Sequence, residues 1–306
     1  MRHIGTVASS HFKSGGRTVL GYPYSTTLAN ASINVSTFFP GYVAGSSDIT
    51  ITVNAGVYLY STTSGVAGLT ISGGTTGDTI TVLNNGYIAG LGGNGGTSSV
   101  PTAGGPAIKL TLTSGQTPTV TINNNSASAY IGGGGGGGAG TGGAGGGGGA
   151  GGGNGGFVSG LNGLGGFAGA LGYPSSADAY TGSGGGSLFT SPSGGTGAVY
   201  NGSSTTAPST SRCGGGGGVG TLVNSAGGGG GGWGQAGGNS ISVTGLTGSL
   251  TAGSGGGLVA GGNAFVGGGT TTSSSGAAAG KAVEFSGFAG TVNVIGTTAN
   301  IYGVRS

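Results

Sequence analysis

The chain has 306 residues, of which 87 are glycine and only 4% are charged, and its formal net charge is +3. Its seven basic residues occur singly, so we expect no face that could follow a phosphate backbone. Two histidines and one cysteine cannot supply the converging groups that acid–base catalysis or a metal site requires. The composition therefore predicts a protein that is not an enzyme and has no cofactor, metal or nucleic-acid partner.

The first twenty residues contain no apolar run of the roughly 7 to 15 residues that a secretory signal needs. The long uncharged stretches consist of Gly, Ser, Thr and Ala, whereas a membrane span needs roughly 20 mostly apolar residues. Low charge and abundant small polar residues nevertheless suit an outer surface. We expect a virion protein that is assembled in the host cytoplasm.

Short runs of alternating apolar and polar residues fill the first 130 residues and indicate β-strands. The expected strands are 32–36, 48–53, 57–60, 79–83, 108–112 and 119–122. The turn-forming clusters Asn54-Ala55-Gly56 and Asn84-Asn85-Gly86 separate or follow them. No segment has a helical period. The pattern predicts an all-β N-terminal domain over residues 1–130, which would serve attachment or assembly, and essentially no α-helix.

From residue 131 the composition changes, and residues 132–156 alone contain twenty glycines. Further glycine runs follow at 184–186, 214–218, 227–232, 255–257 and 267–269. Between them lie segments with larger side chains. We expect a second domain over residues 131–280.

The glycine runs can form either a flexible linker or an ordered lattice. Ordering a backbone costs roughly 1 to 2 kcal/mol per residue, and more for glycine, so a lattice requires a dense hydrogen-bond network. The left-handed threefold helix supplies one, because all its N–H and C=O groups point outward to neighbouring helices. The flanks Tyr130-Ile131, Phe157-Val158 and Trp233 are aromatic or apolar, unlike those of a linker. We therefore predict a sandwich of polyglycine II helices; collagen is excluded because the strict G-X-Y repeat is absent.

An internal similarity links the middle of the chain to its end. The stretch 106–132 is echoed by 281–303, and a shorter copy covers 79–88. The first two copies close at Tyr130-Ile131-Gly132 and Ile301-Tyr302-Gly303. A C-terminal strand pair over residues 281–306 is therefore expected to return to a β-layer and close the fold.

In a glycine lattice the segments between the helices become loops at its ends. Aromatic residues in such loops either pack on the outside of the sandwich or remain accessible as binding anchors. The candidate receptor-binding residues are Phe157, Phe167, Tyr173, Tyr180, Phe189, Tyr200, Trp233 and Phe265.

Polyglycine runs that alternate with aromatic, Ser/Thr-rich segments after a β-rich region resemble a known family pattern. The similarity covers roughly residues 85–306 and includes the stretches 85–96, 104–108 and 301–303. In this pattern the chain resembles the Gly-rich receptor-recognising adhesins at the tips of long tail fibres of T-even-like bacteriophages. It also resembles Gly-rich tail-tip host-specificity proteins. The resemblance implies that loops 157–181, 187–212 and 233–252 contact an outer-membrane protein or a surface glycan.

The resemblance also implies that the N-terminal domain binds another tail-fibre or tail-tip protein. The adhesin would attach either as a single copy or as a homotrimer. Two other functions stay open. A structural protein of the tail tip or baseplate would use the same lattice as a stiff spacer without receptor specificity. An ice-binding protein would present flat Thr/Ala faces, but the Thr residues here have no constant spacing.

Overall fold

The structure is a computed structural model that describes most of the chain before residue 141 and selected segments after it. The described segments are 12–14, 16–63, 65–96, 100–112, 114–140, 228–231, 235–244, 263, 270–286 and 290–306, together with the backbone of eight two-residue strands between residues 169 and 266. Within these segments nearly all regular structure is β-strand. The all-β prediction is confirmed.

Three parallel sheets contain most of the strands. The first sheet consists of β2 (Arg17–Tyr24), β5 (Ser47–Val53), β8 (Thr79–Asn84), β11 (Thr119–Asn124) and β24 (Val292–Gly296), with β1 (Phe12–Ser14) antiparallel at the edge of β2. The second sheet consists of β3 (Leu28–Ala29), β6 (Tyr58–Tyr60), β9 (Tyr87–Ala89), β12 (Tyr130–Gly132) and β25 (Ile301–Tyr302). The third sheet consists of β4 (Ala31–Asn34), β7 (Leu69–Ser72), β10 (Ile108–Thr111) and β23 (Val283–Phe285).

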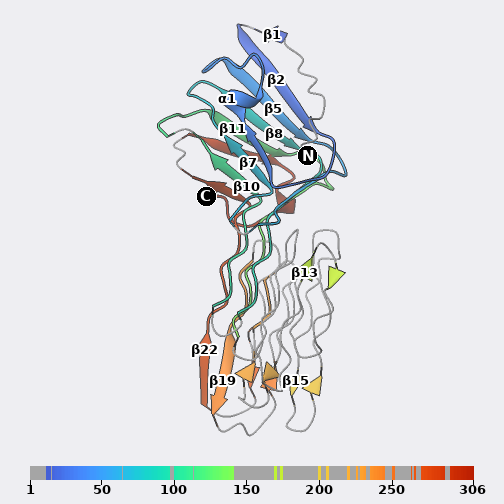
Figure 1. Cartoon of the computed structure of the whole chain (residues 1–306), viewed down its shortest axis with the longest axis vertical. Coiled ribbons are helices and arrows are strands. Elements are labelled where there is room, and N and C mark those ends of the chain that lie inside the picture. The colour runs from blue at the N-terminus through green and yellow to red at the C-terminus, as the bar shows by residue number, and fades with distance from the viewer. Residues whose placement is uncertain are drawn as a thin grey trace.

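The chain visits these sheets in a fixed order, first, second and then third, so that each circuit forms one coil of a parallel β-helix. Because the first sheet has five parallel strands, there are five coils. In the last coil, the bridge between Arg305 and Val283 takes the place of a strand in the third sheet. The β-helix is therefore completed by residues from both ends of the sequence (Figure 1).

Inward-facing aliphatic side chains fill the β-helix. Ile49, Ile80 and Val120 lie in register on neighbouring strands of the first sheet, and each is at most 1% exposed. β-Branched side chains suit this position because they pack closely between neighbouring strands. At the corner after the first sheet, the buried Asn84 donates its amide N–H to the side-chain oxygen of Asn124 at 2.8 Å. Amide side chains thus continue the stack where the chain turns.

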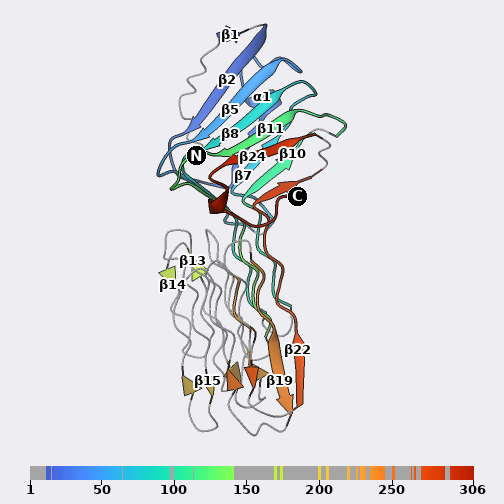
Figure 2. The same cartoon turned by 180° about the vertical axis from the view of Figure 1, so that it is seen from behind.

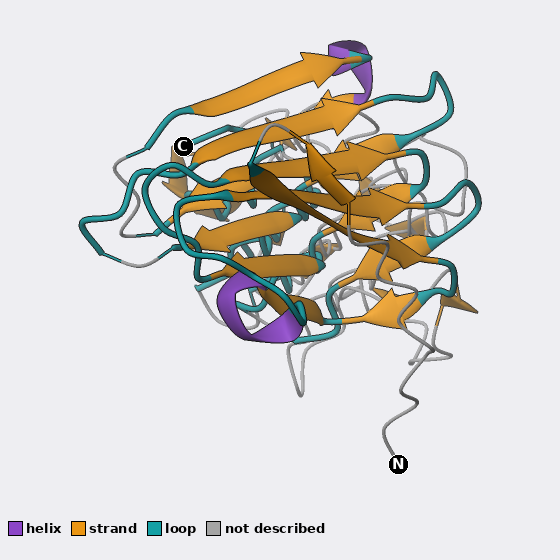
Figure 3. Cartoon of the chain, turned by 90° about the horizontal axis from the view of Figure 1, so that it is seen from above, coloured by secondary structure: helices purple, strands orange, loops and turns teal. Residues whose placement is uncertain are grey.

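The corner between the second and third sheets carries the two longest insertions. The connection from the second to the third sheet is Asn30 in the first coil, 61–68 in the second, 90–107 in the third and 133–282 in the fourth. The glycine-rich region is therefore an insertion within one coil, and residues 283–302 return to the sheets that β2 to β12 form. Seen from above, the strands of the β-helix lie side by side (Figure 3).

A short helix replaces the end of one expected strand. The expected strand 32–36 stops at Asn34, and α1 (Val35–Phe38) follows. The reason is local, because the side chain of Asn34 accepts the backbone N–H of Ser36 at 3.1 Å and caps the helix. A 3₁₀ turn, η1 (Thr298–Asn300), precedes β25.

The glycine-rich segments extend away from the end of the β-helix that β24 occupies, as both side views show (Figures 1 and 2). They lead to β19 (Ser240–Thr244) and β22 (Thr270–Ser274), an antiparallel pair at the opposite end of the molecule. The remaining short strands are β13 (Gly169–Ala170), β14 (Tyr173–Pro174), β15 (Val199–Tyr200), β16 (Thr205–Thr206), β17 (Val219–Gly220), β18 (Ser225–Ala226), β20 (Leu250–Thr251) and β21 (Phe265–Val266). No helix within the described segments is long and apolar enough to cross a membrane.

Candidate receptor-binding surfaces

Segment 133–140 lies in the middle of the described glycine-rich backbone and bonds to its neighbours at intervals of three residues. Three N–H groups of segment 90–96 bond to three carbonyl groups in parallel: Gly90 to Gly132, Gly93 to Gly135 and Gly96 to Gly138, at 2.8 to 3.0 Å. A spacing of three is the repeat of the threefold helix.

The same segment is bonded on its other sides. Gly134 and Gly137 donate to Gly105 and Thr102, and Gly280 and Ala277 donate to Gly134 and Gly137 in turn. Further bonds join it to 228–231 and 235–238. Backbone groups thus satisfy one another across the bundle. The assignment of the whole region 131–280 to polyglycine II stays a prediction, because most of residues 141–262 lie outside the described segments.

Close approach of these backbones requires glycine at particular positions. A Cβ added to Gly134 would overlap the carbonyl group of Leu91, and a Cβ added to Gly104 would overlap the carbonyl group of Gly134. Neither obstacle is a side chain that could rotate away. The glycine content of these segments therefore has a steric cause.

The eight candidate receptor-binding residues fall in or near the least described part of the chain. Phe157, Phe167, Tyr180, Phe189 and Trp233 lie outside the described residues, and only the backbone is described at Tyr173, Tyr200 and Phe265. The prediction that these side chains contact a receptor stays a prediction.

The strands that carry three of these positions lie in two places. Tyr200 in β15 and Phe265 in β21 belong to one four-stranded sheet, with β20 between them. This sheet lies at the end far from the β-helix, at the level of β19 and β22 (Figure 1). Tyr173 lies in the β13–β14 hairpin, which is at the end near the β-helix (Figure 2). The structure therefore brings Tyr200 and Phe265 into one sheet and places Tyr173 elsewhere.

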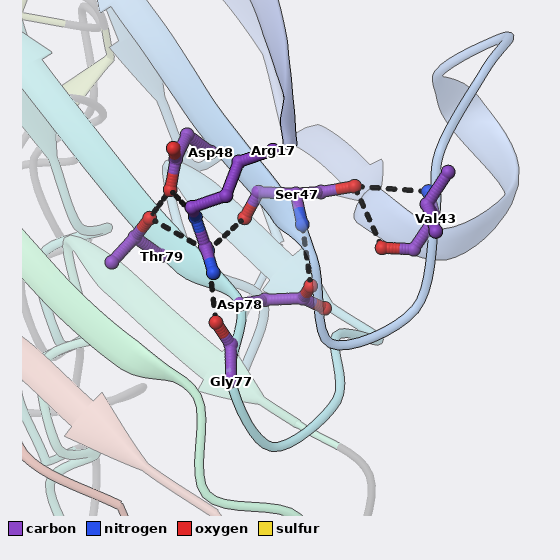
Figure 4. Close-up of polar contacts among 7 residues, drawn as sticks. All are labelled: Arg17, Val43, Ser47, Asp48, Gly77, Asp78 and Thr79. Atoms are coloured by element: carbon purple, nitrogen blue, oxygen red, sulfur yellow. Dashed lines mark hydrogen bonds and ion pairs between the residues drawn. The ribbon is translucent and has the colours of Figure 1, made fainter. Parts of the chain in front are cut away.

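The main charged cluster of the described residues joins three neighbouring parallel strands of the first sheet, β2, β5 and β8 (Figure 4). Arg17 on β2 donates to the Asp48 carboxylate at 2.8 Å and to the carbonyl oxygen of Gly77 at 2.8 Å. The hydroxyl of Thr79 also donates to Asp48. Partial burial raises the pKa of Asp48, but the bonds from Thr79 and Arg17 and the charge of Arg17 outweigh it, so the net pKa is lowered. These contacts link neighbouring coils.

A second carboxylate, Asp78, is fully buried beside this cluster. It accepts the backbone N–H groups of Ser47 at 3.1 Å and Thr75 at 2.9 Å, and the hydroxyl of Tyr42 at 2.7 Å. Its oxygens are occupied by groups of the protein itself. Among the described residues, no group of three or more His, Cys, Asp or Glu could hold a metal ion.

The outer surface of the second sheet carries five tyrosines, which we call the tyrosine face: Tyr58, Tyr60, Tyr87, Tyr130 and Tyr302. Three of them, Tyr58, Tyr87 and Tyr130, lie in one register column on β6, β9 and β12. Their rings stack, with centroids 4.3 Å apart for Tyr58 and Tyr87 and 5.4 Å apart for Tyr87 and Tyr130. The ring of Tyr302 extends the stack at 6.2 Å from Tyr130.

Sequence reasoning did not single out the tyrosine face as a surface. The signal was present in the repeat, whose copies close at Tyr87, Tyr130 and Tyr302. It could have been found by aligning the copies as coils, because equivalent residues of successive coils lie next to each other.

A β-helix with a long glycine-rich extension defines an elongated, non-globular scaffold with surfaces at both ends. A family model described as phage tail fibre adhesin Gp38 matches residues 22–213, which is well over half of the chain. The chain belongs to this family of phage tail-fibre adhesins. No curated protein and no solved structure matches it. Family membership places the protein in the virion tail and implies binding to the host surface.

Proposed function

We propose that the glycine-rich region of this tail-fibre adhesin recognises a receptor on the host cell, through loops 157–181, 187–212 and 233–252. The receptor would be an outer-membrane protein or a surface glycan. The observation that carries the proposal is the placement of the four-stranded sheet β16-β15-β20-β21 at the end far from the β-helix (Figure 1). Two of the candidate aromatic residues, Tyr200 and Phe265, belong to this sheet.

The hydrogen-bonded glycine segments support this proposal because they fix the far end relative to the β-helix. A binding surface held in one arrangement loses little conformational entropy when it binds, which favours affinity. No catalytic step is needed for this role, and we propose that the protein acts without one.

We further propose that the opposite end of the β-helix attaches to another tail-fibre or tail-tip protein, as a single copy or as a homotrimer. The first coil supports this, because its end carries an aromatic cluster. Tyr22 and Phe38 are partly exposed and pack edge to face, with centroids 4.8 Å apart. Leu28, which is in register with the buried Leu59, is 45% exposed. An apolar end of this kind is suited to a protein interface.

The receptor proposal can be tested with a variant that lacks the far end. Residues 141–274 are replaced by a short Gly-Ser turn, which joins segments that already lie side by side through the bonds of Ala277 to Gly137 and Gly280 to Gly134. We expect this variant to attach to virions that lack the adhesin and to lose adsorption to Gram-negative host cells.

Point variants then locate the contact. Replacing Tyr200 and Phe265 together by Ala is expected to reduce adsorption, whereas Val100→Ala, at an exposed apolar side chain outside the three proposed loops, serves as the control. Thermal melting of each variant checks that the fold is kept. If the deletion variant adsorbs to cells as well as the full chain does, the proposed role of the far-end loops is wrong.

A further inference from the structure

The tyrosine face is a surface that the β-helix core does not require. On the same strands the inward-facing residues Leu59, Ile88 and Ile131 are each 0% exposed and fill the interior. The tyrosines point to the other side of the sheet, and all five are partly exposed. Five of the eleven tyrosines of the chain lie on this one face.

The arrangement of the rings follows from the register. Tyr58, Tyr87 and Tyr130 are direct neighbours on adjacent strands. Tyr302 is in register with Gly132 rather than with Tyr130. Because Gly132 has no side chain, the ring of Tyr302 can lie over it and stack on the ring of Tyr130. The column runs along the axis of the β-helix, at about the 4.8 Å spacing of neighbouring strands.

Stacked rings turn their faces toward one another, and each of these tyrosines remains partly exposed. A phenol hydroxyl both donates and accepts hydrogen bonds. Burial raises the pKa of Tyr58, and its hydrogen bond to Tyr87 and the charges of Tyr87 and Tyr130 raise it further. At neutral pH the hydroxyl of Tyr58 keeps its proton, as that of an ordinary tyrosine does.

The face is also uncharged. The other outward positions on the strands of the second sheet are Ala29, Ala89 and Gly132. The first and third sheets differ, because they carry the ion pairs Arg17–Asp48 and Lys109–Glu284 on their outer sides. A charged ligand would gain nothing on the tyrosine face. A partner must instead be neutral, elongated and able to exchange hydrogen bonds with the tyrosine hydroxyl groups at regular intervals.

We propose that the tyrosine face binds a neutral polysaccharide chain that lies along the axis of the β-helix. Sugar rings offer hydroxyl groups that can both donate to and accept from the tyrosine hydroxyl groups. The site is separate from the loops at the far end of the glycine-rich region, so it adds a glycan-binding surface to the proposed receptor-binding function. An adhesin with both would hold a surface polysaccharide along its side while its far end contacts the receptor.

The experiment measures binding of the full-length protein to three neutral probes, maltohexaose, cellohexaose and dextran, by titration calorimetry and affinity electrophoresis. Polygalacturonate is the charged comparison. We expect at least one neutral probe to bind and polygalacturonate to bind at least tenfold more weakly. The double variant Tyr87→Ala with Tyr130→Ala is expected to weaken neutral binding at least tenfold.

Two further variants separate binding from folding. Replacing Tyr87 and Tyr130 by Phe keeps the ring stack and removes the hydroxyls, so it should weaken binding while the melting temperature stays near that of the wild type. Replacing Thr81 and Thr121 on the outer side of the first sheet by Ala should leave binding unchanged. The variant of Tyr200 and Phe265 should also keep polysaccharide binding, which distinguishes this site from the receptor site. The proposal is overturned if no neutral probe binds, if the Ala and Phe variants bind as the wild type does, or if the face captures only a protein of the fibre.

Discussion

The hydroxyl of Tyr42 donates to the carboxylate of Asp78 across 36 positions of sequence, at 2.7 Å. This bond joins the loop that leads into β5 to the turn that precedes β8. Because Asp78 also accepts the backbone N–H of Ser47, one carboxylate fixes the start of two neighbouring strands. The two coils are thus joined outside their sheet hydrogen bonds.

Replacing Asp78 by Ala is expected to destabilise the protein by about 3 kcal/mol or more, because it leaves several buried donors without an acceptor. Tyr42→Phe removes only one of the bonds and is the matched control, with an expected cost of about 1 kcal/mol. Urea unfolding of the two variants measures both values. Equal costs would show that the backbone donors find other acceptors.

The contacts of Asp48 predict a dependence of stability on pH. Its pKa in the folded state lies below the usual value of 3.8, so the ionised carboxylate favours the folded state. This contribution is complete above about pH 4 and is lost as the pH falls through the folded-state pKa. Asp48→Asn should therefore lower the melting temperature at pH 7 by about 2 to 4 °C, and the difference from the wild type should shrink below about pH 4.

The melting temperature of Glu284→Gln is compared with that of Asp48→Asn. Glu284→Gln breaks the ion pair with Lys109, whose charged atoms are 3.5 Å apart on a partly exposed surface. Such pairs contribute about 0 to 1 kcal/mol. A pH-independent difference between Asp48→Asn and the wild type would contradict the assigned role of the carboxylate.

The steric role of glycine in the bundle can be tested at Gly134. Gly134→Ala brings a methyl group onto the carbonyl group of Leu91, so the segments must separate, at an expected cost of about 1 to 3 kcal/mol or more. At Gly21 the nearest atom to an added Cβ is 3.9 Å away, and Gly21→Ala should be tolerated. Hydrogen exchange of the backbone amides in the glycine-rich bundle should show a loss of protection in Gly134→Ala. Equal protection in Gly134→Ala and Gly21→Ala would refute the steric argument.

The fourth prediction concerns the buried amide side chains of Asn84 and Asn124 at the corner after the first sheet. Asn124 donates to the carbonyl oxygens of Ala129 at 3.1 Å and Thr297 at 3.0 Å, which lie in different coils. Asn124→Ala should cost about 2 to 4 kcal/mol, since these groups and Asn84 lose their partners. The control is Asn125→Ala. Asn125 is exposed, and its side-chain amide donates to the side-chain oxygen of Asn85 at 2.8 Å. Thermal melts that shift equally for the two variants would contradict this account.

Much of the β-helix could be predicted from local sequence patterns. The expected strands 48–53, 79–83 and 119–122 correspond to β5, β8 and β11, because alternation directly reflects one buried and one outer face. The echo between 106–132 and 281–303 is also physical, since Ile108 pairs with Val283 and Ile131 with Ile301.

The coil architecture itself could not be deduced from those patterns. Equivalent strands are separated by insertions of very different length, so the sequence has no constant period that would indicate a solenoid. Only spatial pairing shows that residues 133–282 leave and rejoin the same corner. The tyrosine face was missed for the same reason, because Tyr58 and Tyr130 become neighbours of Tyr87 only when the coils are aligned.

The direction of the glycine-rich segments has a mechanical consequence. Segments 90–96, 133–140 and 275–280 all run between the β-helix and the far end, and their mutual hydrogen bonds lie across that direction (Figure 2). A pulling force between a tethered cell and the tail would load these bonds in shear, so that many must break together. An adhesin of this construction resists detachment through the number of its backbone bonds rather than through the strength of any one of them.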